Sequence, residues 1–197
     1  MKRISLTFLL CTAVIISGCR NENRDDDTDA MMEQDTIQTT DNDPLQQSRK
    51  LQVEIESRSG SELSGNAVFT EENGEVTMTA VIDGLSEGMH AIHLHENADC
   101  SAEDGSSAGG HWNPTFEKHG EWGDSEGYHK GDIGNFKVDA NGNGTITFST
   151  DEWCIGCDDE TKNIIGTSVV VHDGVDDFTT QPSGDAGTRV GCGEINE

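Results

Sequence analysis

The chain has 197 residues, which is enough for one domain of ordinary size with tails. Its formal net charge of −26 excludes a nucleic-acid-binding protein and argues against docking on anionic lipid, because these partners carry the same sign of charge. No segment of the sequence is both apolar and long enough to span a bilayer.

The first residues predict an export signal. Lys2 and Arg3 precede an apolar run over residues 4–16, and two small residues then lead to Cys19. Small residues directly before a cysteine resemble the lipobox of bacterial lipoproteins, which implies a signal peptide at 1–18, cleavage before Cys19 and lipidation of its thiol. A plain secretory signal cut elsewhere is the alternative, and Cys19 would then have no role. Loss of Lys2 and Arg3 makes the charge −28.

Residues 19–48 are polar and acidic, with scarcely any large apolar side chain. Such a segment cannot bury enough apolar surface to offset its ordering entropy, so we expect a disordered tether. Its typical span is about 30 Å, and repulsion between its carboxylates would lengthen it. The tether would hold a domain at 49–197 off the membrane of a bacterial cell envelope, on its periplasmic or outer side.

The pattern of residues 49–197 is that of an all-β domain. Apolar residues alternate with polar ones at Leu51, Val53 and Ile55, as in a half-buried strand. Asn73-Gly74 predicts a hairpin, and the Asn-Gly repeat at 141–144 predicts a second one. About eight short strands indicate an antiparallel sandwich or barrel. Besides 51–55, we expect strands near 67–69, 76–82, 90–95, 136–138, 145–148, 168–172 and 189–192.

Two long segments rich in Gly, Asp and Ser interrupt these strands, at 96–131 and 173–188. Structureless loops of this length in a compact domain are usually functional or disordered. The first loop carries His111, His119 and His129, with Asp132 directly after it. Metal ligation, together with a disulfide from Cys100, would give this loop the order that packing does not supply.

Six of the seven histidines form a pattern typical of metal sites, since imidazole is the commonest transition-metal ligand. His93 and His95 lie two apart on an expected strand, so both point to one face. His119, His129 and Asp132 add a nitrogen and oxygen set that suits zinc. Each feature taken singly has a non-metal explanation: His93 and His95 could be a surface pair, His119 a loop histidine and Asp132 a turn residue. The whole set together predicts metal binding.

Six cysteines fit an oxidising compartment. Cys11 would leave with the signal peptide and Cys19 would be lipidated, which leaves an even number that can pair in three ways. Cys154 and Cys157 form a Trp-Cys-x-x-Cys motif that resembles the thioredoxin active site. Acidic residues and β-strands flank the motif here, so a local disulfide is favoured over a soft Cu(I) or zinc site. The four remaining cysteines are Cys100, Cys154, Cys157 and Cys192.

From about Gln52 to Ile195 the sequence is similar to the copper/zinc superoxide dismutase family. The resemblance implies an eight-stranded antiparallel Greek-key fold and an enzyme with one copper and one zinc ion per subunit, which dismutates superoxide to oxygen and hydrogen peroxide. The segments that carry it are 88–95 (GMHAIHLH), 109–114 (GGHWNP), 118–120 (KHG), 129–135 (HKGDIGN), 169–173 (VVVHD) and 184–193 (GDAGTRVGCG).

The resemblance also implies roles for individual residues. Asp176 matches an aspartate that hydrogen-bonds one copper ligand and one zinc ligand, and Arg189 matches the arginine beside the copper channel. Cys100 and Cys192 match the family disulfide, and His90 a structural histidine. The copper ligands would be His93, His95, His111 and His172, and the zinc ligands His111, His119, His129 and Asp132.

Elementary chemistry supports these roles. Copper alternates between two oxidation states, which an imidazole set with an open face tolerates, whereas zinc keeps one state and anchors the site. A deprotonated His111 between the metals would be released from copper on reduction and would carry one proton toward peroxide. Arg189 would attract and orient the anion; a surface salt bridge is its alternative role.

Three features depart from the animal enzymes of this family. The loop from Asp176 to Arg189 is shorter and contains no lysine, so we expect local attraction of superoxide by the metals and Arg189. Lys118 and Lys130 either add to this positive field or are simply solvated. The polar C-terminus at 194–197 makes the animal type of dimer doubtful, which leaves a monomer or another interface.

Two other functions compete with a superoxide dismutase that protects the cell envelope. A copper carrier or buffer of the same fold would bind both metals without turnover. A metal-free adhesion module would bind neither metal. No copper ligand and no channel arginine is missing from the sequence, which favours the enzyme.

Overall fold

The computed structural model describes residues 48–197. The predicted signal peptide, Cys19 and the tether up to residue 47 therefore lie outside the described residues. Within the described part of the chain, no helix has the length and apolar character that a membrane crossing needs.

Eight strands form where the sequence alternates, and most extend beyond the predicted cores. β3 is typical, because every second residue from Val76 to Ile82 is buried. Asn73 and Gly74 both have positive φ in the tight turn that joins β2 to β3, as expected for an Asn-Gly hairpin. The strands are β1 (Arg49–Ser57), β2 (Ser64–Glu72), β3 (Glu75–Asp83), β4 (Gly88–His95), β5 (Gly134–Val138), β6 (Gly144–Thr150), β7 (Ser168–His172) and β8 (Arg189–Glu194).

The strands close into one antiparallel barrel in the order β1-β2-β3-β6-β5-β4-β7-β8. β3 pairs with β6 and β4 pairs with β7, so the chain twice crosses between strands that are not neighbours in sequence, as in a Greek key. The predicted all-β fold is confirmed, and of the two predicted arrangements the structure is the closed barrel.

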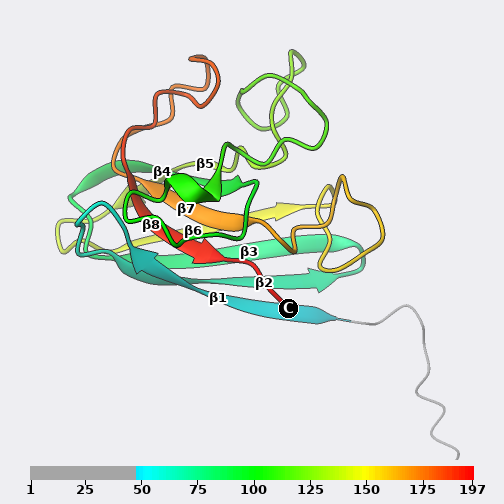
Figure 1. Cartoon of the computed structure of the whole chain (residues 1–197), viewed down its shortest axis with the longest axis horizontal. Coiled ribbons are helices and arrows are strands. Elements are labelled where there is room, and N and C mark those ends of the chain that lie inside the picture. Colours follow the sequence, from blue (N-terminus) through cyan, green and yellow to red (C-terminus); the bar gives the residue numbers. More distant parts are fainter. Residues whose placement is uncertain (1–47) are drawn as a thin grey trace, which may run out of the picture. The chain divides into compact units, whose positions relative to one another are not determined.

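The barrel interior is filled by the inward residues of these strands, among them Ile55, Phe69, Met78 and Ile82, which are all essentially inaccessible to solvent. β4, β7 and β8 are buried on both faces over most of their length. The loops between β4 and β5 and between β7 and β8 project from the same side of the barrel, at the top of Figure 1. The outward residues of β4 and β7 thus lie between the barrel wall and these loops.

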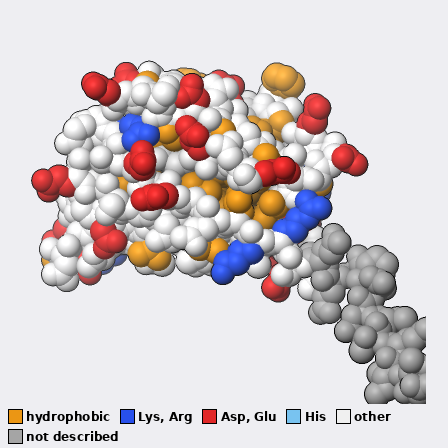
Figure 2. All heavy atoms as spheres, turned by 60° about the horizontal axis from the view of Figure 1, so that its bottom comes forward, with side chains coloured by type: hydrophobic (Ala, Val, Ile, Leu, Met, Phe, Trp, Pro, Cys, Tyr) orange, Lys and Arg blue, Asp and Glu red, His pale blue; other side chains and the backbone are white. Residues whose placement is uncertain are grey.

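The two long loops have the predicted positions, since β4 ends at His95, β5 begins at Gly134, and the second loop fills the interval between β7 and β8. One short 3₁₀-helix, η1 (Ser106–Ala108), interrupts the first loop. Figure 2, a view from the side that is lowest in Figure 1, shows acidic side chains spread over the surface with few basic ones between them.

Candidate metal centre

Buried ligand atoms gather in two adjacent clusters that share His111. Within each cluster the ligand atoms lie within 4.8 Å of one another. The structure thus brings together all seven side chains that the sequence predicts as ligands, from residues that span 80 positions of the chain. The first cluster is His93, His95, His111 and His172; the second is His111, His119, His129 and Asp132.

Six buried ring nitrogens of these clusters have no hydrogen-bond partner. Buried polar atoms are almost always paired, so each orphan needs an explanation, and six in one place point to ions that the nitrogens coordinate. The donor set is all imidazole in the first cluster, and imidazole plus one carboxylate in the second. These residues fit a copper ion and a zinc ion, respectively. The orphans are His93 Nδ1, His95 Nε2, His111 Nε2, His119 Nδ1, His129 Nδ1 and His172 Nε2.

Strand geometry places the first cluster. In β4, Ile92 and Leu94 point into the core, so His93 and His95 point outward beneath the loops. His111 forms an isolated β-bridge with His95, which brings the loop back alongside β4. His172 ends β7, next to an irregularity in its pairing with β8.

Hydrogen bonds orient the rings of the first cluster. His95 Nδ1 donates to the carbonyl oxygen of Gly109 at 3.0 Å, which leaves its Nε2 as the free ligand atom. His172 Nδ1 makes a longer contact of 3.4 Å with the carbonyl oxygen of Gly187. Such outer partners set the tautomer and the ring direction of a metal ligand. The sequence did not reveal these two carbonyl groups, because backbone acceptors carry no side-chain signal.

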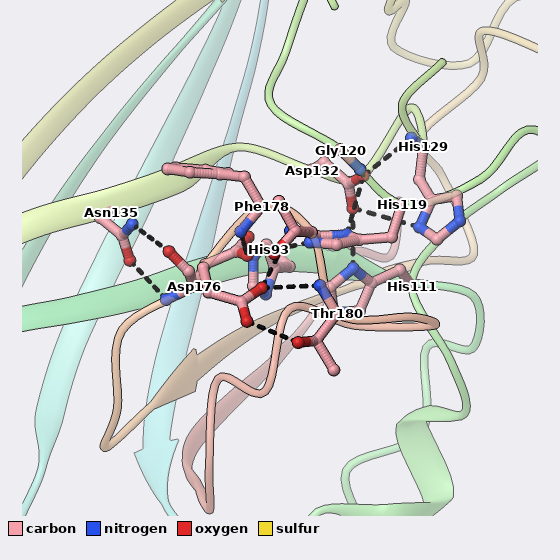
Figure 3. Close-up of polar contacts among 12 residues, drawn as sticks. His93, His111, His119, Gly120, His129, Asp132, Asn135, Asp176, Phe178 and Thr180 are labelled. Carbon is pink, nitrogen blue, oxygen red and sulfur yellow. Dashed lines mark hydrogen bonds and ion pairs between the residues drawn. The ribbon is translucent and has the colours of Figure 1, made fainter. Parts of the chain in front are cut away.

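Asp132 is the common partner of the second cluster. Its Oδ1 lies 2.7 Å from His111 Nδ1 and 3.2 Å from His129 Nδ1, and its Oδ2 lies 3.0 Å from His119 Nδ1. Oδ2 also accepts the backbone N–H groups of Gly120 and His129, at 3.1 and 2.8 Å. Figure 3 shows the carboxylate facing the three rings. Although burial opposes it, the close contacts with these histidines hold the pKa of Asp132 well below its usual range, so its carboxylate is charged at neutral pH.

Asp176 joins the two clusters. Its Oδ2 accepts from His93 Nε2 and its Oδ1 from His119 Nε2, both at 2.9 Å, as Figure 3 shows. The Asn135 side chain holds the Asp176 backbone through two hydrogen bonds of 2.8 and 2.9 Å. Gly184 packs so closely against Asp176 that a Cβ there would collide with the carboxylate. Asn135 and Gly184 lie in the segments 129–135 and 184–193, which resemble the family, but nothing in the sequence indicates that they support Asp176.

The electrostatics differ between the clusters. Burial lowers the pKa of His111 to about 4, although Asp132 raises it, and burial also lowers the pKa values of His95 and His172 well below the usual value. Burial acts in the same direction on His119, but its close contacts with the Asp132 and Asp176 carboxylates outweigh it and raise the pKa to about 9. His95, His111 and His172 are therefore neutral and ready to coordinate at pH 7, whereas His119 carries a proton that a cation must displace.

Arg189 lies at the start of β8, and its charge acts on the first cluster. Its Nη1 donates to the carbonyl oxygen of Gly105 at 2.8 Å, and its charge contributes to the lowered pKa values of His95 and His172. Lys118 and Lys130, the two other candidates for a positive field, are both ion-paired, with Glu126 at 2.8 Å and with Glu152. Neither lysine is simply solvated.

The four cysteines within residues 48–197 form two disulfides. Cys100 pairs with Cys192, which ties the first long loop to β8, and Cys154 pairs with Cys157. His90 is buried outside both clusters, with its Nδ1 3.1 Å from the carbonyl oxygen of His172. It therefore contacts the backbone of a predicted copper ligand.

Comparison with known proteins identifies the family. Residues 63–195 match the family model described as copper/zinc superoxide dismutase. The copper/zinc superoxide dismutase of Botryotinia fuckeliana is 38% identical over 148 residues, which cover 70% of this chain and 92% of that protein. The extracellular copper/zinc superoxide dismutase of Caenorhabditis elegans is 34% identical over 141 residues, and this match covers 68% of the chain but only 62% of the relative.

A solved structure agrees with these sequence matches. The crystal structure of a double mutant of a SOD-like protein from Bacillus subtilis superposes with a TM-score of 0.66 at 28% identity, and the match covers 74% of this chain and 97% of the other. The chain therefore belongs to the copper/zinc superoxide dismutase family, which confirms the predicted enzyme class and its two metals.

Proposed function

We propose that this chain dismutates superoxide at a bimetallic centre in which His111 links copper to zinc. Copper would be held by His93 Nδ1 and by Nε2 of His95, His111 and His172. Zinc would be held by Nδ1 of His111, His119 and His129 and by an oxygen of Asp132. The observation that carries this proposal is the set of six orphaned ring nitrogens in two clusters that share one imidazole.

The reaction consumes two superoxide anions and two protons and yields oxygen and hydrogen peroxide. A bound copper ion would supply the one-electron redox chemistry, since copper has two accessible oxidation states. The chain would supply the proton path at Nε2 of His111, a buried nitrogen without a hydrogen-bond partner, which would hold a proton and pass it to the reduced oxygen. The opposite nitrogen, Nδ1, lies 2.7 Å from Asp132, and both groups would hold zinc, so the ring would keep its place while Nε2 changes state.

Arg189 would orient the substrate. A guanidinium group stays charged in proteins and presents donors in a fixed plane, which suits a small anion. The hydrogen bond from its Nη1 to the Gly105 carbonyl oxygen fixes the orientation of the guanidinium plane. The Cys100–Cys192 disulfide would help to hold the loop that carries Gly105 close to β8, where Arg189 stands.

We also propose an extracytoplasmic site of action. Two disulfides are typical of oxidising compartments, and one relative is named as an extracellular enzyme. The signal peptide at 1–18, lipidation of Cys19 and the acidic tether at 19–48 would place the domain at a membrane of the bacterial envelope, where it would remove superoxide from outside the cytoplasm.

Pulsed production of superoxide, with its decay followed by absorbance, tests the function. Wild type loaded with copper and zinc should accelerate the decay by many orders of magnitude over buffer, and His172→Ala should lose most of this rate. Both metals bound without acceleration would indicate a carrier or buffer. No stoichiometric metal in wild type would indicate an adhesion module. Either result would reject the proposal.

A further inference from the structure

We propose that Glu152 is a positioning residue for the zinc ligand His129. The inference rests on the zinc set proposed above and concerns the chain's own residues around it. Glu152 directly follows the turn out of β6, far in sequence from every ligand, and the similarity to the family assigns it no role. Its carboxylate binds the side chains of both residues that flank His129 in the sequence, Tyr128 and Lys130.

The contacts are specific. Tyr128 donates its hydroxyl to Oε1 of Glu152 at 2.7 Å, and the ammonium group of Lys130 pairs with Oε2. One carboxylate therefore uses its two oxygens on residues 128 and 130, and His129 lies between them. Two such bonds restrain the backbone of residue 129 more than either bond alone, because they oppose rotation of the segment about a single contact.

A third contact fixes the same segment. Trp153 Nε1 donates to the backbone carbonyl of Lys130 at 2.8 Å. Trp153 is only 1% exposed and packs against Phe69 and Phe148, with ring centroids 6.3 and 5.1 Å away. Residues 152 and 153 thus hold residues 128–130 against the barrel core.

The support itself is well anchored. The Glu152 backbone N–H donates to the Thr150 hydroxyl at the end of β6, at 3.0 Å. Cys154, two residues later, exchanges backbone hydrogen bonds with Lys162 and Ile164, at 2.8 and 3.0 Å, and pairs with Cys157. Glu152 therefore stands between a barrel strand and a turn closed by a disulfide, which keeps its carboxylate in place.

His129 has a particular need for this support. The remote nitrogen of His119 is held by Asp176 at 2.9 Å, and His111 is held by Asp132. In residues 48–197, by contrast, no hydrogen bond reaches Nε2 of His129. Its backbone is held by Asp132, whose Oδ2 accepts the His129 N–H at 2.8 Å and whose own N–H donates to the His129 carbonyl oxygen at 3.0 Å. The direction of this ring is thus set through the backbone, which Glu152 and Trp153 restrain on either side. A loosely held ligand lowers metal affinity.

The alternative role of Glu152 is a simple ion pair with Lys130 at the surface, and such pairs contribute little to the free energy of unfolding. The two possibilities differ in what they change. A surface pair would affect, at most, the free energy of unfolding. A positioning residue also affects the coordination geometry at the zinc set and the rate at which zinc leaves it.

The test uses the full chain loaded with copper and zinc. Zinc release into a chromogenic chelator should be faster in Glu152→Ala on the order of tenfold, the lower end of the effect of outer-shell partners. Glu152→Gln keeps one acceptor and should fall between Glu152→Ala and wild type. Tyr128→Phe, which removes only the hydroxyl, should accelerate release less than Glu152→Ala. Glu160→Gln, an exposed carboxylate of the same loop, is the matched control and should equal wild type.

A second readout reports geometry directly. In protein carrying copper and Co(II) in place of zinc, the visible Co(II) bands should shift in Glu152→Ala and Glu152→Gln and stay unchanged in Glu160→Gln. Release rates and bands equal to wild type in both Glu152 variants would overturn the inference, as would equal acceleration by Glu160→Gln. Failure of wild type to bind zinc or Co(II) would instead reject the proposed function, so the two failures are distinguishable.

Discussion

Asp176 Oδ1 accepts a hydrogen bond of 2.9 Å from His119 Nε2, and both side chains are completely buried. The second oxygen of this carboxylate accepts from His93, so one side chain orients a ligand in each metal cluster. Phe178 supports the arrangement, because its backbone N–H donates to Oδ1 at 2.7 Å. The two clusters are therefore connected through Asp176 as well as through His111, the residue that they share.

Replacing Asp176 should consequently weaken both sites. Asp176→Asn replaces one acceptor oxygen with an amide NH2 donor. The asparagine side chain therefore cannot accept hydrogen bonds from His93 and His119 together. We expect copper and zinc affinities to fall by about 10- to 100-fold, measured by competition with chelators of known affinity. Asp185→Asn, which changes an exposed carboxylate of the same loop, is the control. Loss of only one metal affinity would show that the two contacts act separately.

Zinc binding should release a proton at pH 7. The folded, metal-free His119 has a pKa of about 9 and is protonated at pH 7, whereas zinc needs its free Nδ1. About one proton per zinc should therefore appear in solution, and this release should fade as the pH rises through 9, where the proton is already lost. Calorimetry in buffers of different ionisation enthalpy measures it. A release that does not change between pH 7 and pH 10 would contradict the assignment.

Copper added to the zinc-loaded protein should release about one further proton at pH 7, and from a different atom. His95 and His172 have lowered pKa values and contribute none, since their rings are already neutral. The proton would come instead from Nε2 of His111, because a ring that binds a cation at each nitrogen cannot keep a proton on either one. The same calorimetry checks the number. Copper binding without proton release would count against His111 as the shared ligand.

The two disulfides should differ in their effect on stability. Loop-closure entropy predicts about 5 kcal/mol for Cys100–Cys192, which closes 92 residues, and about 2 kcal/mol for Cys154–Cys157, which closes 3. Urea unfolding of the metal-free double serine variants, Cys100→Ser/Cys192→Ser and Cys154→Ser/Cys157→Ser, gives both values. A larger loss from the second pair would indicate that its role is not limited to loop closure.

Arg189 should account for most of the attraction of superoxide. Carboxylates outnumber cations on this protein, and Lys118 and Lys130 are neutralised by partners, so only a local field remains. Arg189→Ala should lower kcat/KM by about tenfold or more and flatten its fall with ionic strength. Lys137→Gln, an exposed cation on β5, is the control. A wild-type rate that does not fall with added salt would contradict local steering.

Local sequence alone was sufficient to predict the strands, and together with the family resemblance it predicted the membership of the metal clusters. Period-two alternation marks a strand because successive side chains point to opposite faces, and this rule needs no information from the rest of the chain. The same rule places His93 and His95 together on one face. Asn73-Gly74 predicted its hairpin because both residues tolerate positive φ. Family resemblance then ordered the remaining ligands along the chain.

Only the tertiary structure decided how these ligands are held. His93 and Asp176 are 83 residues apart in the sequence, and Glu152 is more than 20 residues from Tyr128 and Lys130, which it binds. No local pattern therefore predicts either contact. Backbone acceptors such as Gly109 and the pairing of the lysines likewise follow from where the closed barrel brings distant loops. Periodicity determines which face a residue occupies, but the neighbours on that face are set by strand order and loop path, which depend on the whole chain.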